Sequence, residues 1–385
     1  ARNVLLLQKE PGESGKGPYD WGPSVMRDGR LYKMWWVRLG GANQQRFPYA
    51  TTLPSGERFE FTYPDYGDRI YYAESTDGRT WNLTGPEYAG SVDAFGPDAP
   101  GPLLVLAPSE SAGERMHLGC PTVIKVKGTY YLYYETCGEF KVTQGPDGKI
   151  SVGDEYHNQV FVATSNDGKR WRKHPDDHHP RPVIAAPESN KLFDRRRYGL
   201  GQPSVFYHKG RFVMHYVDSC NGPGDFIVRV DSDEPLFRKP RVFGRSLAEV
   251  AGDASIPPGA VARFAGTDVR YLDDTLYLLR AAWGTGNLGL LASRTGLFPA
   301  DAHAKAPAEV FPQVSLKDPR GPQYRTRLYP RFLTDPEGTV LIENGRAIVF
   351  LTTGLGFKEA ADTWDLARCE IQVDEMRRVV KASGH

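Results

Sequence analysis

Four acidic residues adjoin strand-like hydrophobic phrases and are the first candidates for chemistry. They are Asp20, three positions before Pro23, Glu135 in "YYETCGEF", Asp218 in "MHYVDSC" and Asp268 in "GTDVRYLDD". Two carboxyl groups held close together can act as a proton donor and as a base or nucleophile, provided that their surroundings separate the two pKa values. We therefore predict that the catalytic acids are among these four residues.

Seven further polar and aromatic residues stand near the same strand ends, and we predict that they contact the substrate. They are Trp21, Arg38, His117, Gln202, His215, Arg270 and Arg331. Arginine binds a carboxylate or sulfate through two parallel hydrogen bonds, so these arginines favour an anionic ligand. Each residue also has a structural interpretation, because acids pair with arginines and histidines are often buried structural residues.

A repeated phrase in the sequence predicts the strands that must position these residues. "GPSVMRDGRLYKMWW" begins at Gly22, "CPTVIKVKGTYYLYYE" at Cys120 and "QPSVFYHKGRFVMHYVD" at Gln202, and a weaker copy, "GTDVRYLDDTLYLLRAA", begins at Gly266. Each copy predicts an apolar strand, a tight turn and an aromatic-rich second strand. Asp28-Gly29 is the strongest of the turn signals, because both central residues of a two-residue hairpin loop need positive φ.

A second phrase follows two of these predicted hairpins. "YYAESTDGRTW" ends at Trp81 and "VFVATSNDGKRW" ends at Trp171. The shared S-x-D-G-x-x-W pattern predicts a tight turn after which an indole packs between sheets. Four strands repeated around an axis are typical of a propeller blade.

We therefore predict an all-β, five-bladed β-propeller with four antiparallel strands per blade, in which residues 1–385 form a single domain. A degenerate fifth copy begins near Arg327, and six blades is the alternative count. The N-terminal "NVLLLQ" is expected to add a strand to the last sheet, which would leave no long edge unpaired.

The predicted turns are tight at one end of the blades, whereas long connections gather at the other end. The long connections are residues 39 to 68, 82 to 116, 138 to 156 and 172 to 200. Loops of this length are often functional. We predict that the face bearing these long loops is the binding face.

Composition excludes several classes of function. The 385 residues carry 48 basic and 47 acidic side chains, and this net charge of +1 gives no support to a nucleic-acid partner. No apolar run approaches the roughly 18 residues of a spanning helix, so we expect no membrane insertion. The start "ARNVLLLQKE" lacks the features of a signal peptide. If the protein is secreted or periplasmic, we expect its signal peptide to have been removed.

The four cysteines show no C-x-x-C spacing, which argues against a zinc ribbon or a thioredoxin-like site. If the turn is at Lys127-Gly128, Cys120 and Cys137 lie one diagonal step apart on the same face. If the turn is one residue later, the two cysteines lie directly opposite each other. A disulfide or a close thiol pair is compatible with that spacing. A disulfide would favour an exported protein, and two free thiols would favour the cytoplasm.

The blade-opening phrases and the S-x-D-G-x-x-W turns resemble the five-bladed propeller glycoside hydrolases, the group of families 32, 43, 117 and 130. The likeness covers nearly the whole chain. In families 32 and 43, the carboxylates of the site stand directly before or beside the proline of the innermost strands, so the resemblance implies acids in the column of residues before that proline. Here Cys120 and Gln202 occupy that column, Asp20 lies three positions before its proline, and Asp268 lies one step past the column. The resemblance therefore implies a propeller with a divergent active site.

The resemblance implies a glycoside hydrolase that acts on a poly- or oligosaccharide, anionic if the arginines bind it. Such enzymes need two carboxyl groups about 5 to 9.5 Å apart. We expect Asp20 to be the base or nucleophile, with the acid drawn from Glu135, Asp218 and Asp268. No cofactor is required, and a structural calcium ion in the channel is left open, although no run of acidic ligands announces one.

Two other functions fit the same residues. In a polysaccharide lyase, an arginine such as Arg197 would neutralise a uronate, and His117, His215 or Tyr198 would remove the C5 proton. In a non-catalytic glycan-binding propeller, the absence of acids from the column before the proline would not matter.

Overall fold

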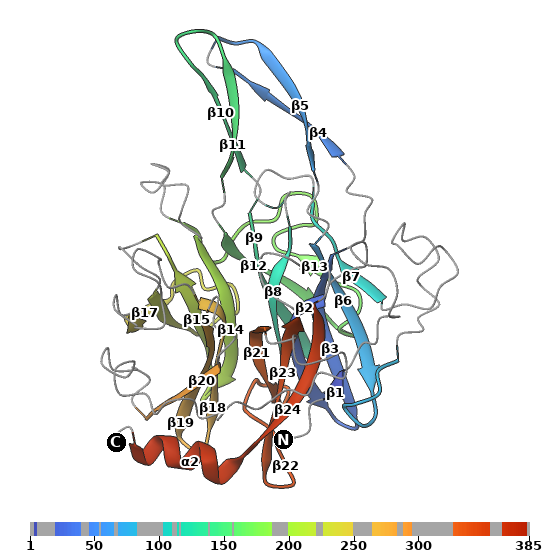
Figure 1. Cartoon of the computed structure of the whole chain (residues 1–385), viewed down its shortest axis with the longest axis vertical. Coiled ribbons are helices and arrows are strands. Elements are labelled where there is room, and N and C mark those ends of the chain that lie inside the picture. The colour runs from blue at the N-terminus through green and yellow to red at the C-terminus, as the bar shows by residue number, and fades with distance from the viewer. Residues whose placement is uncertain are drawn as a thin grey trace.

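The protein is nearly all-β (Figure 1). The computed structural model describes residues 4–5, 20–39, 46–53, 55–64, 68–82, 103–109, 114, 117–137, 139–155, 158–186, 199–220, 226–248, 264–282, 288–294, 326–354 and 364–382. Within these stretches the only helix is α2 (Val373–Ala382). It is not long and apolar enough to cross a membrane.

The strands fall into five antiparallel groups in chain order. The first contains β2 (Asp20–Asp28), β3 (Leu31–Leu39), β6 (Asp68–Ser75) and β7 (Leu103–Leu106). The second contains β8 (Gly119–Val126), β9 (Thr129–Thr136), β12 (Gln159–Ser165) and β13 (Arg172–Lys173). The third contains β14 (Leu200–His208), β15 (Arg211–Asp218), β16 (Phe226–Ser232) and β17 (Arg241–Ala248).

The fourth group has three described strands, β18 (Phe264–Leu272), β19 (Thr275–Ala282) and β20 (Leu288–Ser293). The fifth contains β21 (Thr326–Thr334), β22 (Ile342–Glu343), β23 (Arg346–Gly354), β24 (Asp365–Gln372) and the N-terminal β1 (Val4–Leu5). Val4 lies opposite Arg368 of β24, so the prediction that the N-terminal segment adds a strand to the last sheet is confirmed. A short parallel pairing of β2 with β21 joins the fifth group to the first.

The first strands of the five groups contact one another in a cycle. β2 contacts β8, β8 contacts β14, β14 contacts β18, β18 contacts β21, and β21 contacts β2. The repeated phrases lie on these strands, so the cycle brings equivalent positions of each copy around one axis. Buried aromatic and aliphatic side chains fill the space between neighbouring groups, as Phe206 of β14 and Val269 of β18 do.

Each first strand is interrupted by a bulge at the same place. The register with the second strand shifts just before or at the proline position in all five groups. The residue before that position has positive φ every time: Gly22, Cys120, Gln202, Gly266 and Tyr329. An extra residue in a left-handed conformation bends the strand and turns its N–H away from the partner strand.

The S-x-D-G-x-x-W turns have the predicted geometry. The Gly78 N–H donates to Ser75 Oγ over 2.8 Å, and the Thr80 N–H donates to Asp77 Oδ1 over 2.7 Å. Trp81 then packs edge-on against Phe350, a residue of the fifth group, with ring centroids 6.1 Å apart. The prediction that the indole packs between sheets is confirmed.

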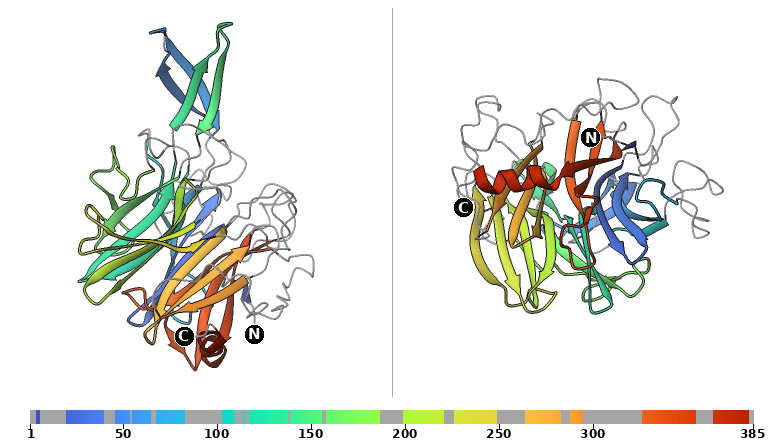
Figure 2. Two further views of the ribbon diagram at one scale, coloured as in Figure 1. Left: turned by 90° about the vertical axis from the view of Figure 1, so that its left-hand side faces the viewer. Right: turned by 90° about the horizontal axis from the view of Figure 1, so that it is seen from below.

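Two predicted long loops contain hairpins of their own. β4 (Arg46–Thr52) pairs with β5 (Arg58–Pro64), and β10 (Glu139–Gln144) pairs with β11 (Ile150–Glu155). Both hairpins project from the same end of the molecule (Figures 1 and 2), which we call the hairpin end. The connections 39 to 68 and 138 to 156 therefore lie at one end, as predicted, but they are not structureless.

α2 was not foreseen in the sequence. Its buried residues Met376, Val379 and Val380 recur at three- and four-residue spacing, so one face of the helix is apolar. The helix contacts β20 and β24 (Figure 2, right). The helix therefore packs against the fourth and fifth groups.

We expect Gly266→Ala to destabilise the fold more than Gly128→Ala, a matched control. Both glycines have positive φ, but a Cβ at Gly266 would lie 2.3 Å from Tyr329 Cα, whereas Gly128 has open space around it. Backbone strain costs about 1–3 kcal/mol at either position. The clash should add about 1–3 kcal/mol at Gly266 alone. Denaturant unfolding of both variants measures the difference, and equal losses would contradict the close approach of β18 to β21.

Candidate functional site

The candidate site lies at the hairpin end of the axis. β2 begins there, and β3 and β9 run into the projecting hairpins there (Figure 1). Asp20 is the first residue of β2, Glu135 is next to last in β9, and Asp218 ends β15. The topology therefore places three of the four predicted acids at the ends of first and second strands, as the repeat implied.

Glu135 and Trp21 crowd together above Gly119. A Cβ at Gly119 would lie 2.8 Å from Glu135 Oε1 and 3.0 Å from Trp21 Cη2. Only glycine leaves room for both side chains there. Glu135 is 2% exposed, and its Oε2 accepts the Gln202 N–H over 2.5 Å. A carboxyl group thus lies beside an indole at the predicted binding face.

Cys120 marks a meeting point of two acids. Burial raises the pKa of its thiol well above the ordinary value, and the Glu135 and Asp68 carboxylates raise it further, whereas Arg331 opposes them. Both carboxylates therefore lie near the thiol. Asp68 also accepts a hydrogen bond of 3.4 Å from Trp21 Nε1. It was missed in the sequence because it begins a third strand, outside the repeated phrases.

His117 is held between acceptors. Its Nδ1 lies 3.5 Å from Asp68 Oδ2, and its Nε2 lies 3.0 Å from Asn158 Oδ1. Burial alone would lower the pKa of His117, but the Cys137 and Asp68 side chains outweigh burial and hold the pKa well above its ordinary value. An imidazolium with both N–H groups engaged fits this setting.

No disulfide joins Cys120 to Cys137. All four cysteines are buried thiols. The turn is at Lys127-Gly128, but the bulge shifts the register so that Gly119 lies opposite Glu135. Two residues further on, His117 and not Cys120 comes to lie against Cys137, and the two side chains are hydrogen-bonded.

Asp20 is held in an internal ion pair. Its Oδ1 accepts from Arg38 Nε over 2.6 Å and from Trp36 Nε1 over 2.7 Å, and its Oδ2 accepts from Arg38 Nη2 over 3.0 Å. The carboxylate is fully buried. Arg38 binds both oxygens of this carboxylate through Nε and Nη2. A structural ion pair therefore accounts for both Asp20 and Arg38.

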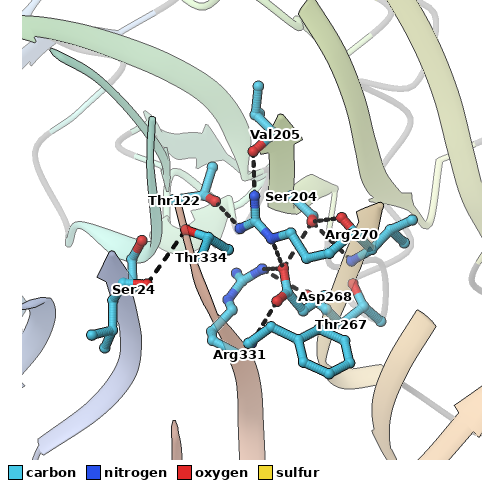
Figure 3. Close-up of polar contacts among 12 residues, drawn as sticks. Ser24, Thr122, Ser204, Val205, Thr267, Asp268, Arg270, Arg331 and Thr334 are labelled. Atoms are coloured by element: carbon cyan, nitrogen blue, oxygen red, sulfur yellow. Dashed lines mark hydrogen bonds and ion pairs between the residues drawn. The ribbon is translucent and has the colours of Figure 1, made fainter. Parts of the chain in front are cut away.

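Asp268 is the hub of a polar network on the axis (Figure 3). It accepts from Ser204 Oγ over 2.9 Å, from Arg270 Nε over 2.8 Å, from the Phe332 N–H over 2.8 Å and from Arg331 Nη1 over 3.3 Å. Arg270 donates further to Thr122 Oγ1 and to the carbonyl of Val205. These bonds use the carboxylate to join three groups of strands.

The remaining predicted residues are more scattered. Asp218 Oδ1 accepts the Cys220 N–H over 2.7 Å, and Gln202 Oε1 accepts the Gly266 N–H over 3.1 Å. His215 lies between the third and fourth groups, stacked on Phe206 at 6.1 Å, and neither of its ring nitrogens has a hydrogen-bond partner among the described residues. Arg197 and Tyr198, named for the lyase alternative, lie outside the described residues.

The axis carries positive charge near Asp268. Two guanidinium groups surround the fully buried carboxylate of Asp268. In the described part of the chain, no group of three or more His, Cys, Asp and Glu side chains could hold a metal ion. A structural calcium ion stays a prediction.

We expect His215→Phe to remove part of the acid sensitivity of the protein. Burial, followed by the Arg229 and Arg270 charges, lowers the pKa of His215 to about 3. The unfolded chain binds this proton near pH 6.5, so the stability from neutral His215 is full above that pH and is lost as pH falls toward 3, by about 1.4 kcal/mol per unit.

Denaturant unfolding of wild type and His215→Phe between pH 7 and pH 4 tests this. As pH falls, the stability of the wild type should drop more steeply than that of His215→Phe. His179→Gln, which changes an exposed histidine, is the control and should follow the wild type. Parallel curves for His215→Phe would show that His215 is not a buried neutral imidazole.

Solved structures resemble the chain, although neither a family model nor a curated protein matches it. BT0996, solved as a complex with RGII, aligns with a TM-score of 0.56 at 12% identity, over 96% of this chain and 90% of that one. Zg3597, a family 117 glycoside hydrolase produced by the marine bacterium Zobellia galactanivorans, aligns with a TM-score of 0.54 at 16% identity, over 95% and 89%. The α-L-arabinofuranosidase PaAbf62A from Podospora anserina, solved with cellotriose, aligns with a TM-score of 0.51 at 14% identity, over 96% and 95%.

These alignments span nearly the full length of both partners, so they cover all five groups of strands. The resemblance read from the repeated phrases is thereby confirmed at the level of the fold: this chain is built like Zg3597 and PaAbf62A, two glycoside hydrolases.

Proposed function

We propose that the chain is a single five-bladed β-propeller that hydrolyses a glycosidic bond in a poly- or oligosaccharide. The cycle of first strands and the strand added by the N-terminus support the blade count. The likeness to glycoside hydrolases of known structure supports the activity.

One observation carries the proposal: Glu135, Asp68 and Trp21 converge around Gly119 and Cys120 at the hairpin end. Glycoside hydrolysis needs two carboxyl groups and a surface for the sugar ring. Among the described acids at the hairpin end, Glu135 and Asp68 meet these needs together.

We assign the proton donor to Glu135 and the base or nucleophile to Asp68, in place of Asp20. The Asp20 carboxylate is bound by Arg38 and Trp36 through both oxygens, so its lone pairs are occupied. Asp268 is similarly saturated. Asp218 stays a predicted acid, and its described contact is with the Cys220 N–H.

A glycan-binding propeller without catalysis is the second candidate. The observation that favours it is that Asp20 and Asp268, two of the four predicted acids, serve ion pairs inside the fold. The lyase alternative gains no support, because none of the three similar structures described above is named as a lyase. Export from the cytoplasm stays a prediction. The four cysteines are buried thiols, so no disulfide supports it.

We expect Glu135→Gln and Asp68→Asn each to lower turnover of a cleavable glycan by about 10²–10⁴-fold while glycan binding persists, because each removes a proton-transfer group. Asp233→Asn, at an exposed turn aspartate, is the control and should leave turnover unchanged. Reducing-end release measures hydrolysis, and calorimetry measures binding.

The same assay separates the alternatives. Binding without product from the wild type would favour the glycan-binding propeller. A product that absorbs in the ultraviolet would favour the lyase. Full turnover by both Glu135→Gln and Asp68→Asn would refute the assignment of these two residues.

A further inference from the structure

Arg331 is a fully buried arginine, and three of its five N–H donors are unused. The side chain is 1% exposed. Its Nη1 donates to the carbonyl of Thr267 over 2.7 Å and lies 3.3 Å from Asp268 Oδ1, but its Nε and Nη2 have no partner among the described residues. An unpaired donor on a buried charged group costs free energy, so a native structure usually supplies an acceptor.

The acid beside Arg331 cannot supply the missing acceptor. Asp268 already accepts hydrogen bonds from Ser204 Oγ, Arg270 Nε and the Phe332 N–H in addition to the one from Arg331. It also shares its single negative charge between two guanidinium groups, those of Arg270 and Arg331, at 2.8 and 3.3 Å. This network of one aspartate and two arginines carries one net positive charge that water does not reach.

The other acids near the axis have contacts of their own. Glu135 turns its Oε2 to the Gln202 N–H, and Asp20 is bound by Arg38. Within the part of the chain that the structure describes, the ion pair of Arg331 is with Asp268. The unused N–H groups therefore call for an acceptor from outside this set of side chains.

The neighbouring groups on the axis are hydroxyls rather than anions. Ser24 and Thr122 occupy the same position of the repeat as Arg331, directly after the proline. Ser24 Oγ accepts the Val123 N–H, and Thr122 Oγ1 accepts from Arg270, so each hydroxyl keeps a hydrogen to donate. Figure 3 shows these hydroxyls on the side of the Arg331 guanidinium away from Thr267.

We propose that a small inorganic anion of the halide class binds on the axis against Nε and Nη2 of Arg331. It neutralises the excess charge of the arginine pair and accepts hydrogen bonds from the two unpartnered nitrogens, Nε and Nη2. A halide fits because the position is enclosed: Cys120, Asp268 and Arg331 are each at most 1% exposed. The ion is a resident part of the fold, distinct from the substrate carboxylate or sulfate that the sequence suggested for the same arginine.

Thermal unfolding in different sodium salts at one ionic strength tests the proposal without depending on activity. An ion that binds only the folded state raises the unfolding midpoint progressively, with the logarithm of its concentration above the dissociation constant. We expect chloride and bromide to raise the midpoint by on the order of 2 °C relative to methanesulfonate. Arg331→Met should abolish this difference, and Arg58→Met, the same change at an exposed arginine, should retain it.

Bromide located directly in crystals of the wild type provides a second measurement, which stands even if Arg331→Met does not fold. An anomalous peak within hydrogen-bond distance of Arg331 Nε and Nη2 is the expected result. A peak without any salt-specific stabilisation would indicate an adventitious ion only and would overturn the proposal. Water at that position, with equal midpoints in all three salts, would also overturn it.

Adding galacturonate at the same ionic strength separates a resident ion from a sugar carboxylate. Stabilisation by galacturonate but not by chloride, lost in Arg331→Met, would place Arg331 in the substrate site and overturn the resident-anion proposal. The proposed hydrolysis can fail without affecting this result, since no glycan is cleaved in the measurement.

Discussion

Side-chain hydrogen bonds join neighbouring first strands at three of the contacts between groups around the axis. Ser24 Oγ accepts the Val123 N–H, Ser204 Oγ accepts the Val269 N–H, and Asp268 Oδ2 accepts the Phe332 N–H. In each case the residue after the proline position binds the backbone of the next group. These bonds help to fix how the first group meets the second, the third meets the fourth and the fourth meets the fifth. β2 pairs with β21 through the backbone, and the Leu200 N–H donates to the Asn158 carbonyl between the second and third groups.

The same constraint decides which polar residues are available for chemistry. A carboxylate that accepts four donors, as Asp268 does, has few lone pairs left to accept a substrate proton. Gln202 is used likewise, since its amide oxygen binds the Gly266 N–H. Residues of the repeat thus serve architecture first. Asp68 lies outside the repeat and is closer to what a catalytic group requires, because Trp21 and His117 orient its carboxylate.

The sequence predicted what depends on local pattern and missed what depends on register. Period, turn residues and repetition foretold the paired strands, the packing of Trp81 and the strand formed by the N-terminus. The first turn was placed one residue too early: Asp28 pairs with Leu31, so Gly29-Arg30 and not Asp28-Gly29 forms the turn, and only Gly29 has positive φ there. The bulge could not be foreseen, because cysteine and glutamine rarely adopt the left-handed conformation that Cys120 and Gln202 have here. That one inserted residue brings His117 to Cys137 and leaves Cys120 outside any disulfide. Asp68 was missed because no repeated phrase includes it.

Glu135 can be compared with its counterpart in the fifth group of strands. Gly119 lies opposite Glu135 and Leu328 lies opposite Thr352, and both pairs stand at the same position of the repeat. Thr352 accepts the N–H of Gly22 through a hydroxyl, just as Glu135 accepts the N–H of Gln202 through a carboxylate. A hydroxyl therefore suffices for the structural bond. The buried carboxyl group of Glu135 exceeds that need, so a role beyond architecture explains it better.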